Sequence, residues 1–152
     1  MNKNEIIKKQ VNLIDFVKQV NESLNISNVD QKEENPISEL MMHKILYLLY
    51  GEFYQTYQRE LFKNANFVAW KLGPVELDYR TWLQNRQQIQ CTKFNLDLSF
   101  AEVDFLENLI KKLLRHSPWY LVDVTHYSQP WLNAYKNSKT QNISIETIKS
   151  YF

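Results

Sequence analysis

The sequence is poor in glycine and cysteine. It contains two glycines, Gly51 and Gly73, in 152 residues. Loops that cradle a phosphate or a dinucleotide need several glycines within one short segment, so these two cannot build such a loop. The one cysteine, Cys91, excludes a disulfide within the chain and is typical of a reducing compartment. We therefore expect a cytoplasmic protein.

Long apolar runs and a strong net charge are also missing. The longest apolar run covers residues 45–50, far short of the roughly 18 residues needed to span a bilayer. The charged N-terminal segment has no apolar core of the kind found in signal peptides. The 18 basic residues nearly balance the 17 acidic ones, giving a net charge of +1. We therefore expect no membrane association, and this balance does not favour nucleic-acid binding.

Catalytic and metal-binding patterns are absent as well. A metal site needs ligands at workable spacing, and no pair among His43, His116 and His126 has the i, i+4 spacing of two ligands on one helix face. Cys91 lies in no recognisable nucleophile motif, and the Gly-x-Ser-x-Gly elbow does not occur. We expect His43 on a helix face and His126 as a hydrogen-bonded structural residue. The sequence therefore predicts no catalytic residue, no metal and no cofactor.

The residues that are present describe a folded helical protein. Hydrophobic residues make up 44% of the chain and charged residues 23%, which is an ordinary globular balance. Apolar residues recur at helical spacing over much of the sequence, beginning with a helix at about 4–23. We predict a mainly α fold: a compact single domain of about six helices, with at most a small two-stranded β element.

Serine and proline mark the predicted starts of several helices. Ser38 is a good N-cap for a helix that reaches about Gln58, and the nearly all-apolar segment 45–50 predicts that this helix lies at the centre of the core. Ser99 and Glu102 have the spacing of a capping box. Further short helices are expected from Pro118, from Pro130 and after Ser144.

The segment "FVAWKLGPV", residues 67–75, holds one of the two glycines. Residues 67–70 are predicted to form a short strand. Pro74 suits the first position of a third helix, where its missing N–H is no loss, and Gly73 supplies the flanking backbone freedom. We therefore expect a structural turn that fixes the start of a helix.

Two longer blocks carry a resemblance to a known family. The block "MMHKILYLLYGEFYQTYQRELFKNANFVAWKLGPVELDYRTW" covers residues 41–82, and "LVDVTHYSQPWLNAYKN" covers 121–137. Together they resemble the Panacea domain, whose members include SocA-like and GepA-like phage-associated proteins. Met41 departs from the pattern, because the family usually has a lysine there. The matching motif residues are Lys44, Tyr47, Trp70, Gly73, Pro74, Val75, Tyr79, Thr125, His126, Pro130, Trp131 and Tyr135.

The resemblance implies an antitoxin that neutralises a cognate protein toxin by direct binding, with no catalytic residues. It covers about 38–152, and the whole chain 1–152 is expected to be one such domain. Two alternatives remain open from the residues themselves. One is an enzyme of unrecognised type, built for example around His126 and a carboxylate. The other is a phage or mobile-element regulator that binds nucleic acid.

A docking site is hypothesised where the two motif blocks meet. We hypothesise a groove edged by Lys71, Tyr79, His126 and Trp131. Lys71 either faces the partner or pairs with an acid inside the protein. Aromatic residues dominate both protein cores and protein interfaces. The sequence therefore leaves open whether the motif aromatics are buried or line the groove.

Overall fold

The computed structural model describes residues 3–26, 37–84, 98–137 and 140–152. In this part of the chain it contains seven helices and one two-stranded antiparallel sheet, so the predicted mainly α class is confirmed. Cys91 and the residues around it lie outside the described ranges. The elements are α1 (Lys3–Ile26), α2 (Glu39–Tyr57), β1 (Phe67–Trp70), β2 (Gly73–Glu76), α3 (Leu77–Gln84), α4 (Phe100–Leu114), α5 (Pro118–His126), α6 (Gln129–Asn137) and α7 (Ile145–Tyr151).

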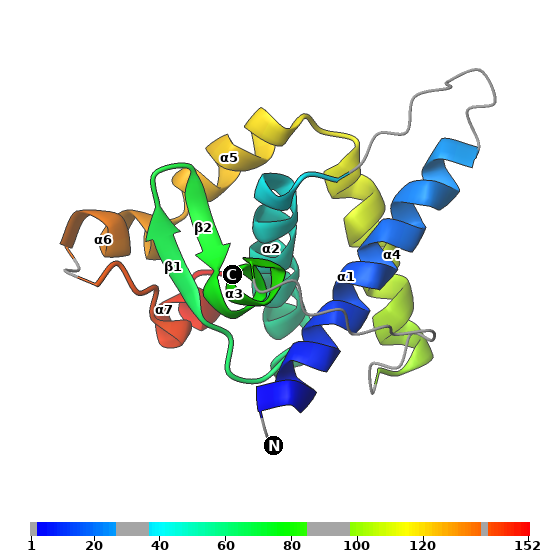
Figure 1. Cartoon of the computed structure of the whole chain (residues 1–152), viewed down its shortest axis with the longest axis horizontal. Helices are drawn as coiled ribbons and strands as arrows, with labels where there is room; N and C mark the ends of the chain where they lie inside the picture. Colours follow the sequence, from blue (N-terminus) through cyan, green and yellow to red (C-terminus); the bar gives the residue numbers. More distant parts are fainter. Residues whose placement is uncertain (1–2, 27–36, 85–97, 138–139) are drawn as a thin grey trace.

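The helix α2 lies at the centre of the molecule, as predicted. Every residue from Met41 to Gly51 is buried, because the segment is apolar on nearly all sides. Figure 1 shows α1 and α4 on one side of α2, with the hairpin and α5 to α7 on the other. The helix contacts β2, α4, α5 and α7. No helix in the described ranges has the length and apolar character that crossing a membrane requires.

Most of the predicted helix starts are confirmed. The Ser38 hydroxyl accepts the Met41 N–H at 3.2 Å and caps α2. Ser99 and Glu102 form the complete capping box at the start of α4. Ser144 stands at the N-cap position of α7, but its side chain makes no capping hydrogen bond. Caps of this kind satisfy backbone N–H groups that have no partner within the helix. The helices predicted from Pro118 and Pro130 are α5 and α6, the latter starting one residue earlier.

The predicted helix start at Pro74 is wrong. Residues Gly73–Glu76 form strand β2, which pairs with β1 so that Trp70 stands opposite Gly73 and Val68 opposite Val75. Lys71 and Leu72 are left as a two-residue turn, and α3 begins only at Leu77. A Gly-Pro pair can open a strand as readily as a helix when the strand has a partner to bond.

The hairpin is tied into the fold at its other edge. The Ala69 N–H donates to the Gln141 carbonyl at 2.7 Å, and the Ile143 N–H donates to the Phe67 carbonyl at 2.9 Å. The polypeptide before α7 therefore extends the pairing of β1. Because backbone groups on both sides of β1 are bonded, the hairpin is a fixed part of the core rather than an appended loop.

Candidate functional site

The two motif blocks lie side by side in space. Strand β1 contacts α6, and β2 contacts α5. The indole N–H of Trp131 on α6 donates to the backbone carbonyl of Trp70 on β1 at 3.0 Å. One hydrogen bond thus joins the tryptophans of the two blocks across 61 residues of sequence. The two motif blocks therefore meet at this contact.

Lys44 of α2 lies beneath the hairpin. Its side chain is 1% exposed, and its ammonium group donates to the Pro74 carbonyl at 3.3 Å. A Cβ on Gly73 would stand 2.8 Å from Cε of Lys44 and 3.0 Å from Oγ1 of Thr125. Burial lowers the pKa of Lys44 to about 8, because a buried ammonium loses its hydration. The lysine, glycine, proline and threonine of the motif therefore form one internal contact.

A second buried chain of hydrogen bonds fixes the junction of α5 and α6. The Ser128 hydroxyl donates to the Thr125 carbonyl at 2.6 Å. It lies 2.9 Å from the Tyr47 hydroxyl of α2, which then acts as the donor between the two. Burial raises the pKa of Tyr47 far above its usual range, so the phenol keeps its proton. The angle between α5 and α6 is thereby tied to the central helix.

Three rings stack on the outer side of this junction. Trp131 stands between His126, at 4.3 Å between ring centroids, and Tyr135, at 4.7 Å. Trp131 is buried and His126 half-buried, whereas Tyr135 is 39% exposed. Contrary to expectation, the Nε2 atom of His126 is buried with no hydrogen-bond partner in the described part of the chain. The stack holds the indole of Trp131 in the orientation that reaches Trp70.

Tyr79 lies in α3, which follows the end of β2 that is farther from the turn. It is buried, and its ring packs edge-on against His43 at 5.5 Å. The Glu76 carboxylate accepts the backbone N–H groups of Tyr79 at 2.9 Å and Asn66 at 2.7 Å, which caps α3. Burial raises the pKa of Glu76 to about 7, and these two hydrogen bonds act in the opposite direction.

His43 lies on a face of α2, as expected, and that face is buried. Its Nδ1 accepts the Glu76 N–H at 3.1 Å, so Nε2 carries the proton and donates to Glu39 at 3.1 Å. Arg80 also donates to the same Glu39 oxygen, at 2.9 Å. Burial lowers the pKa of His43, which favours the neutral ring that this pattern requires.

Two large apolar side chains are exposed at the turn of the hairpin. Trp70 is 38% exposed and Leu72 42%, on either side of exposed Lys71. The Arg80 guanidinium lies 5.1 Å from the centre of the Trp70 ring. We call Trp70, Lys71, Leu72 and the exposed Tyr135 the hairpin surface. Sequence analysis missed Leu72, although a leucine in a two-residue turn has little chance of being buried.

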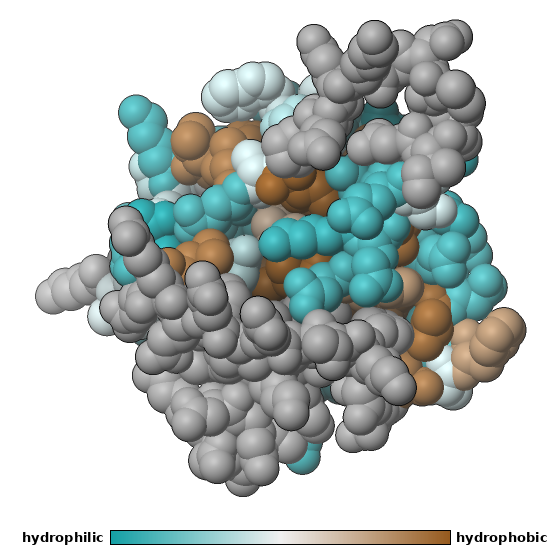
Figure 2. Space-filling view, turned by 45° about the vertical axis from the view of Figure 1, so that its right-hand side comes forward, coloured by the Kyte–Doolittle hydropathy of each residue, from teal (hydrophilic) through white to brown (hydrophobic). Residues whose placement is uncertain are grey.

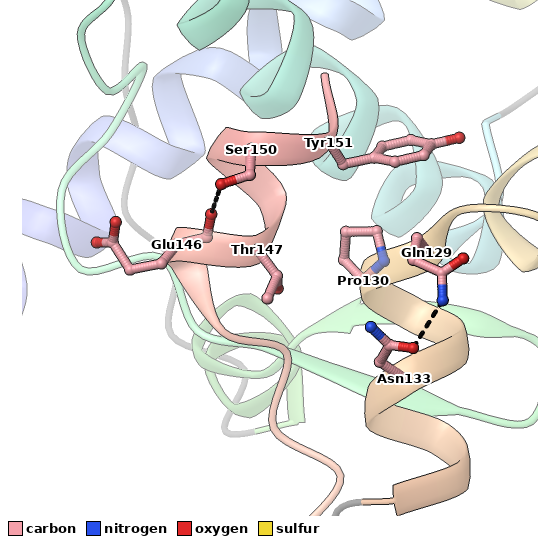
Figure 3. Close-up of a pocket in the computed structure, with 7 residues that line it drawn as sticks. All are labelled: Gln129, Pro130, Asn133, Glu146, Thr147, Ser150 and Tyr151. Atoms are coloured by element: carbon pink, nitrogen blue, oxygen red, sulfur yellow. Dashed lines mark hydrogen bonds between the residues drawn. The ribbon is translucent and has the colours of Figure 1, made fainter.

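A hollow between α6 and α7 lies next to this region (Figure 3). Pro130, a buried motif residue, and Asn133 line it from α6, and Thr147 and Tyr151 line it from α7. The Gln129 amide donates to Asn133 at 2.7 Å, which closes the rim on the α6 side. Its lining carries one charged group, Glu146. Amide, hydroxyl and carboxylate groups thus line the hollow together with the Pro130 ring.

The described residues hold no cluster of three histidines, cysteines, aspartates or glutamates that could bind a metal ion.

The profile of the family described as "Antitoxin SocA-like, Panacea domain" matches residues 42–132. This match spans most of the chain and includes both the hairpin and the start of α6, so the protein belongs to the SocA-like antitoxin family. Searches among curated proteins and among solved structures gave no match.

Proposed function

We propose that this protein is the antitoxin of a toxin–antitoxin pair and that it neutralises a protein toxin by binding it through the hairpin surface. The observation that carries the proposal is the contrast within the motif region. Trp70, Lys71 and Leu72 are exposed at the turn and Tyr135 is exposed on α6, while Lys44 and Trp131 are buried and donate hydrogen bonds to the hairpin backbone. Membership of an antitoxin family supplies the role.

Two of the four residues of the hairpin surface, Trp70 and Tyr135, are of types enriched in binding hot spots. Tryptophan and tyrosine give a large contact area with few rotatable bonds, and leucine and lysine add an apolar contact and one charge. The buried contacts of Lys44 and Trp131 hold the turn in place before the partner arrives. Little conformational entropy is then lost on binding, which favours affinity.

The hypothesised site residues take different parts in this proposal. Lys71 contacts the toxin directly. Trp131 and His126 support the surface from beneath, and Tyr79 anchors the far end of the hairpin. The proposal assigns no catalytic step to any of them. A cytoplasmic location suits this role and the single cysteine of the chain.

The experiment starts from the reading frame next to the gene. Its product is tested for toxicity and for rescue by this protein, and the affinity of the pair is measured by titration calorimetry. Lys71→Ala and Leu72→Ser should each weaken binding by roughly 1 kcal/mol or more if they are hot spots. Because both residues are exposed, the free energy of unfolding should stay within about 0.5 kcal/mol of the wild type.

The matched control is Lys63→Ala. Lys63 is also an exposed lysine next to the hairpin, but it precedes β1 and lies away from the turn. Its removal should leave the affinity unchanged. Equal losses at Lys63 and Lys71 would point to a general charge effect, and unchanged affinity in both turn variants would remove the hairpin surface from the interface.

A further inference from the structure

The outward face of α4 lies away from the motif region and has no role in the function proposed above. The helix turns Glu102, Leu106, Ile110 and Leu113 into the protein, against α1 and α2. On the opposite side its exposed positions recur every three or four residues, which places them along one stripe. These positions are Ala101, Asp104, Asn108, Lys112 and, directly after the helix, Arg115.

Charge is divided along this stripe. The acidic residue Asp104 lies in the first half of α4, and its hydrogen bond comes from the neutral Asn108 amide at 3.4 Å. The basic residues Lys112 and Arg115 lie at the other end, and no ion pair within the described ranges involves either of them. The remaining pair on this side, Glu107 with Lys111 at 2.9 Å, is neutral in itself. The stripe therefore has an acidic end and a basic end.

We infer that this face binds a second copy of the same chain, with the two α4 helices antiparallel across a two-fold axis near Asn108. Asp104 and Lys112 stand one helical turn on either side of Asn108. An antiparallel copy thus places Asp104 of each chain level with Lys112 of the other, forming two equivalent ion pairs. A parallel copy would set like charges against each other, so the charge pattern selects one orientation.

Apolar surface beside the stripe supports the same occupant. Phe105 and Leu109 of α4 are half-buried and line a groove with Tyr57 of α2. Phe100, in the first turn of α4, is 91% exposed. Figure 2 brings the α1–α4 side forward and shows hydrophobic residues reaching the surface there between hydrophilic ones. A large exposed apolar side chain and a partly apolar groove on the same helix are typical of surfaces that are covered in an assembly.

The expected association is weak. One helix pair with its flanking groove buries less than the roughly 1,600 Å² of a standard stable interface. A dissociation constant on the order of tens to hundreds of micromolar follows, and it should rise with salt because exposed ion pairs are screened.

The test uses charge reversal and sedimentation equilibrium of the full-length protein, up to several hundred micromolar. Asp104→Lys places two lysines opposite each other in the homodimer, and Lys112→Glu places two acids opposite each other. Each variant should raise the dissociation constant at least about tenfold. An equimolar mixture of the two should associate again, because the mixed pair restores an attraction at both contacts.

The control is Asp123→Lys, which reverses an exposed acid on α5 and should leave self-association unchanged. Circular dichroism and thermal melting confirm that each variant is folded. A wild type that stays monomeric at the highest concentration would overturn the inference. So would single variants that associate like the wild type, or a mixture that fails to recover. No toxin is needed, so the result is independent of the proposed function.

Discussion

The two glycines of the chain show how one residue type can serve two structural purposes. Gly51 on α2 faces the ring of Phe152, the last residue, and a Cβ at position 51 would overlap that ring. Gly73 on β2 faces the Lys44 side chain, which comes from the same helix α2. Both glycines therefore let another segment approach α2 closely, one through an aromatic contact and one through a buried charge.

The difference lies in the backbone. Gly73 has a φ of +116°, a backbone angle that residues other than glycine rarely adopt. Gly51 has ordinary helical geometry. The neighbour of Gly51 is one half-buried aromatic ring, while the neighbour of Gly73 is held on the central helix. Position 73 thus needs glycine for both conformation and space, and position 51 needs it for space.

The largest effect is expected from Gly73→Ala. The new methyl group meets Lys44 Cε at 2.8 Å and Thr125 Oγ1 at 3.0 Å, and the backbone is strained at the same time. We expect a loss of about 2–4 kcal/mol in the free energy of unfolding, measured by urea denaturation. In a Lys44→Ala background the contact with lysine disappears but the positive φ remains. Gly73→Ala should still destabilise that protein, and a neutral result there would show that space alone matters.

Sequence analysis correctly predicted the features that depend on residues close together in the chain. The capping box of Ser99 and Glu102 and the cap at Ser38 are local patterns, and both are present. The helix start at Pro74 was wrong because the choice between strand and helix depended on β1 and on residues 141–143, which pair with it from far along the chain. Local signals cannot report such a partner.

The burial of Lys44 was beyond prediction for the same reason. The local sequence of a lysine inside an apolar helix segment is the same whether its ammonium group is buried or reaches solvent at the edge of the core. Its actual position depends on the Pro74 carbonyl and on Thr125, which come from two other parts of the chain. In the candidate site, the sequence left open whether Lys71 faces a partner or pairs internally, and which aromatics are buried. The exposure of Lys71 and the division of the aromatics into buried Trp131 and exposed Trp70 and Tyr135 needed the structure.

The second largest effect is expected from the charge of Lys44, which lies beside Gly73. Burial lowers the pKa of Lys44 from 10.5 to about 8, so the folded state holds this proton less firmly than the unfolded state. The cost of the buried charge is full below pH 8 and disappears as the pH rises toward 10.5. The contribution of Lys44 to stability should therefore increase over this window, by up to about 3 kcal/mol.

Lys44→Met is the matched comparison for this prediction. Methionine keeps the length of the side chain and removes the charge, at the loss of the hydrogen bond to Pro74. Unfolding free energies of both proteins are measured by urea denaturation from pH 7.5 to 10. Buried tyrosines titrate in both proteins alike, so the difference between the two isolates Lys44. Parallel curves would show that Lys44 has an unshifted pKa.

A smaller loss is expected from Gly51→Ala. The methyl group displaces the Phe152 ring, which packs edge-on against Tyr47 at 5.6 Å. The lost packing is partly offset by the better helix propensity of alanine, worth about 1 kcal/mol. We expect a net loss of about 1–2 kcal/mol by thermal or urea denaturation. A loss as large as that of Gly73→Ala would mean that the Phe152 ring cannot move aside.

The smallest effect has the opposite sign and separates the two glycines most clearly. In a Phe152→Ala background the ring that excludes a side chain at position 51 is gone, and what remains is a glycine inside a helix. Alanine there reduces the conformational entropy lost on folding, because it restricts the unfolded chain. Gly51→Ala should therefore stabilise the Phe152→Ala variant by about 0.5–1 kcal/mol, although it destabilises the wild type.

The measurement is a double-mutant cycle of Gly51→Ala and Phe152→Ala by urea denaturation. The corresponding cycle of Gly73→Ala with Lys44→Ala should show no such reversal, because its strained φ does not depend on the neighbour. If Gly51→Ala destabilises both backgrounds equally, the Phe152 ring is not the reason for glycine on α2.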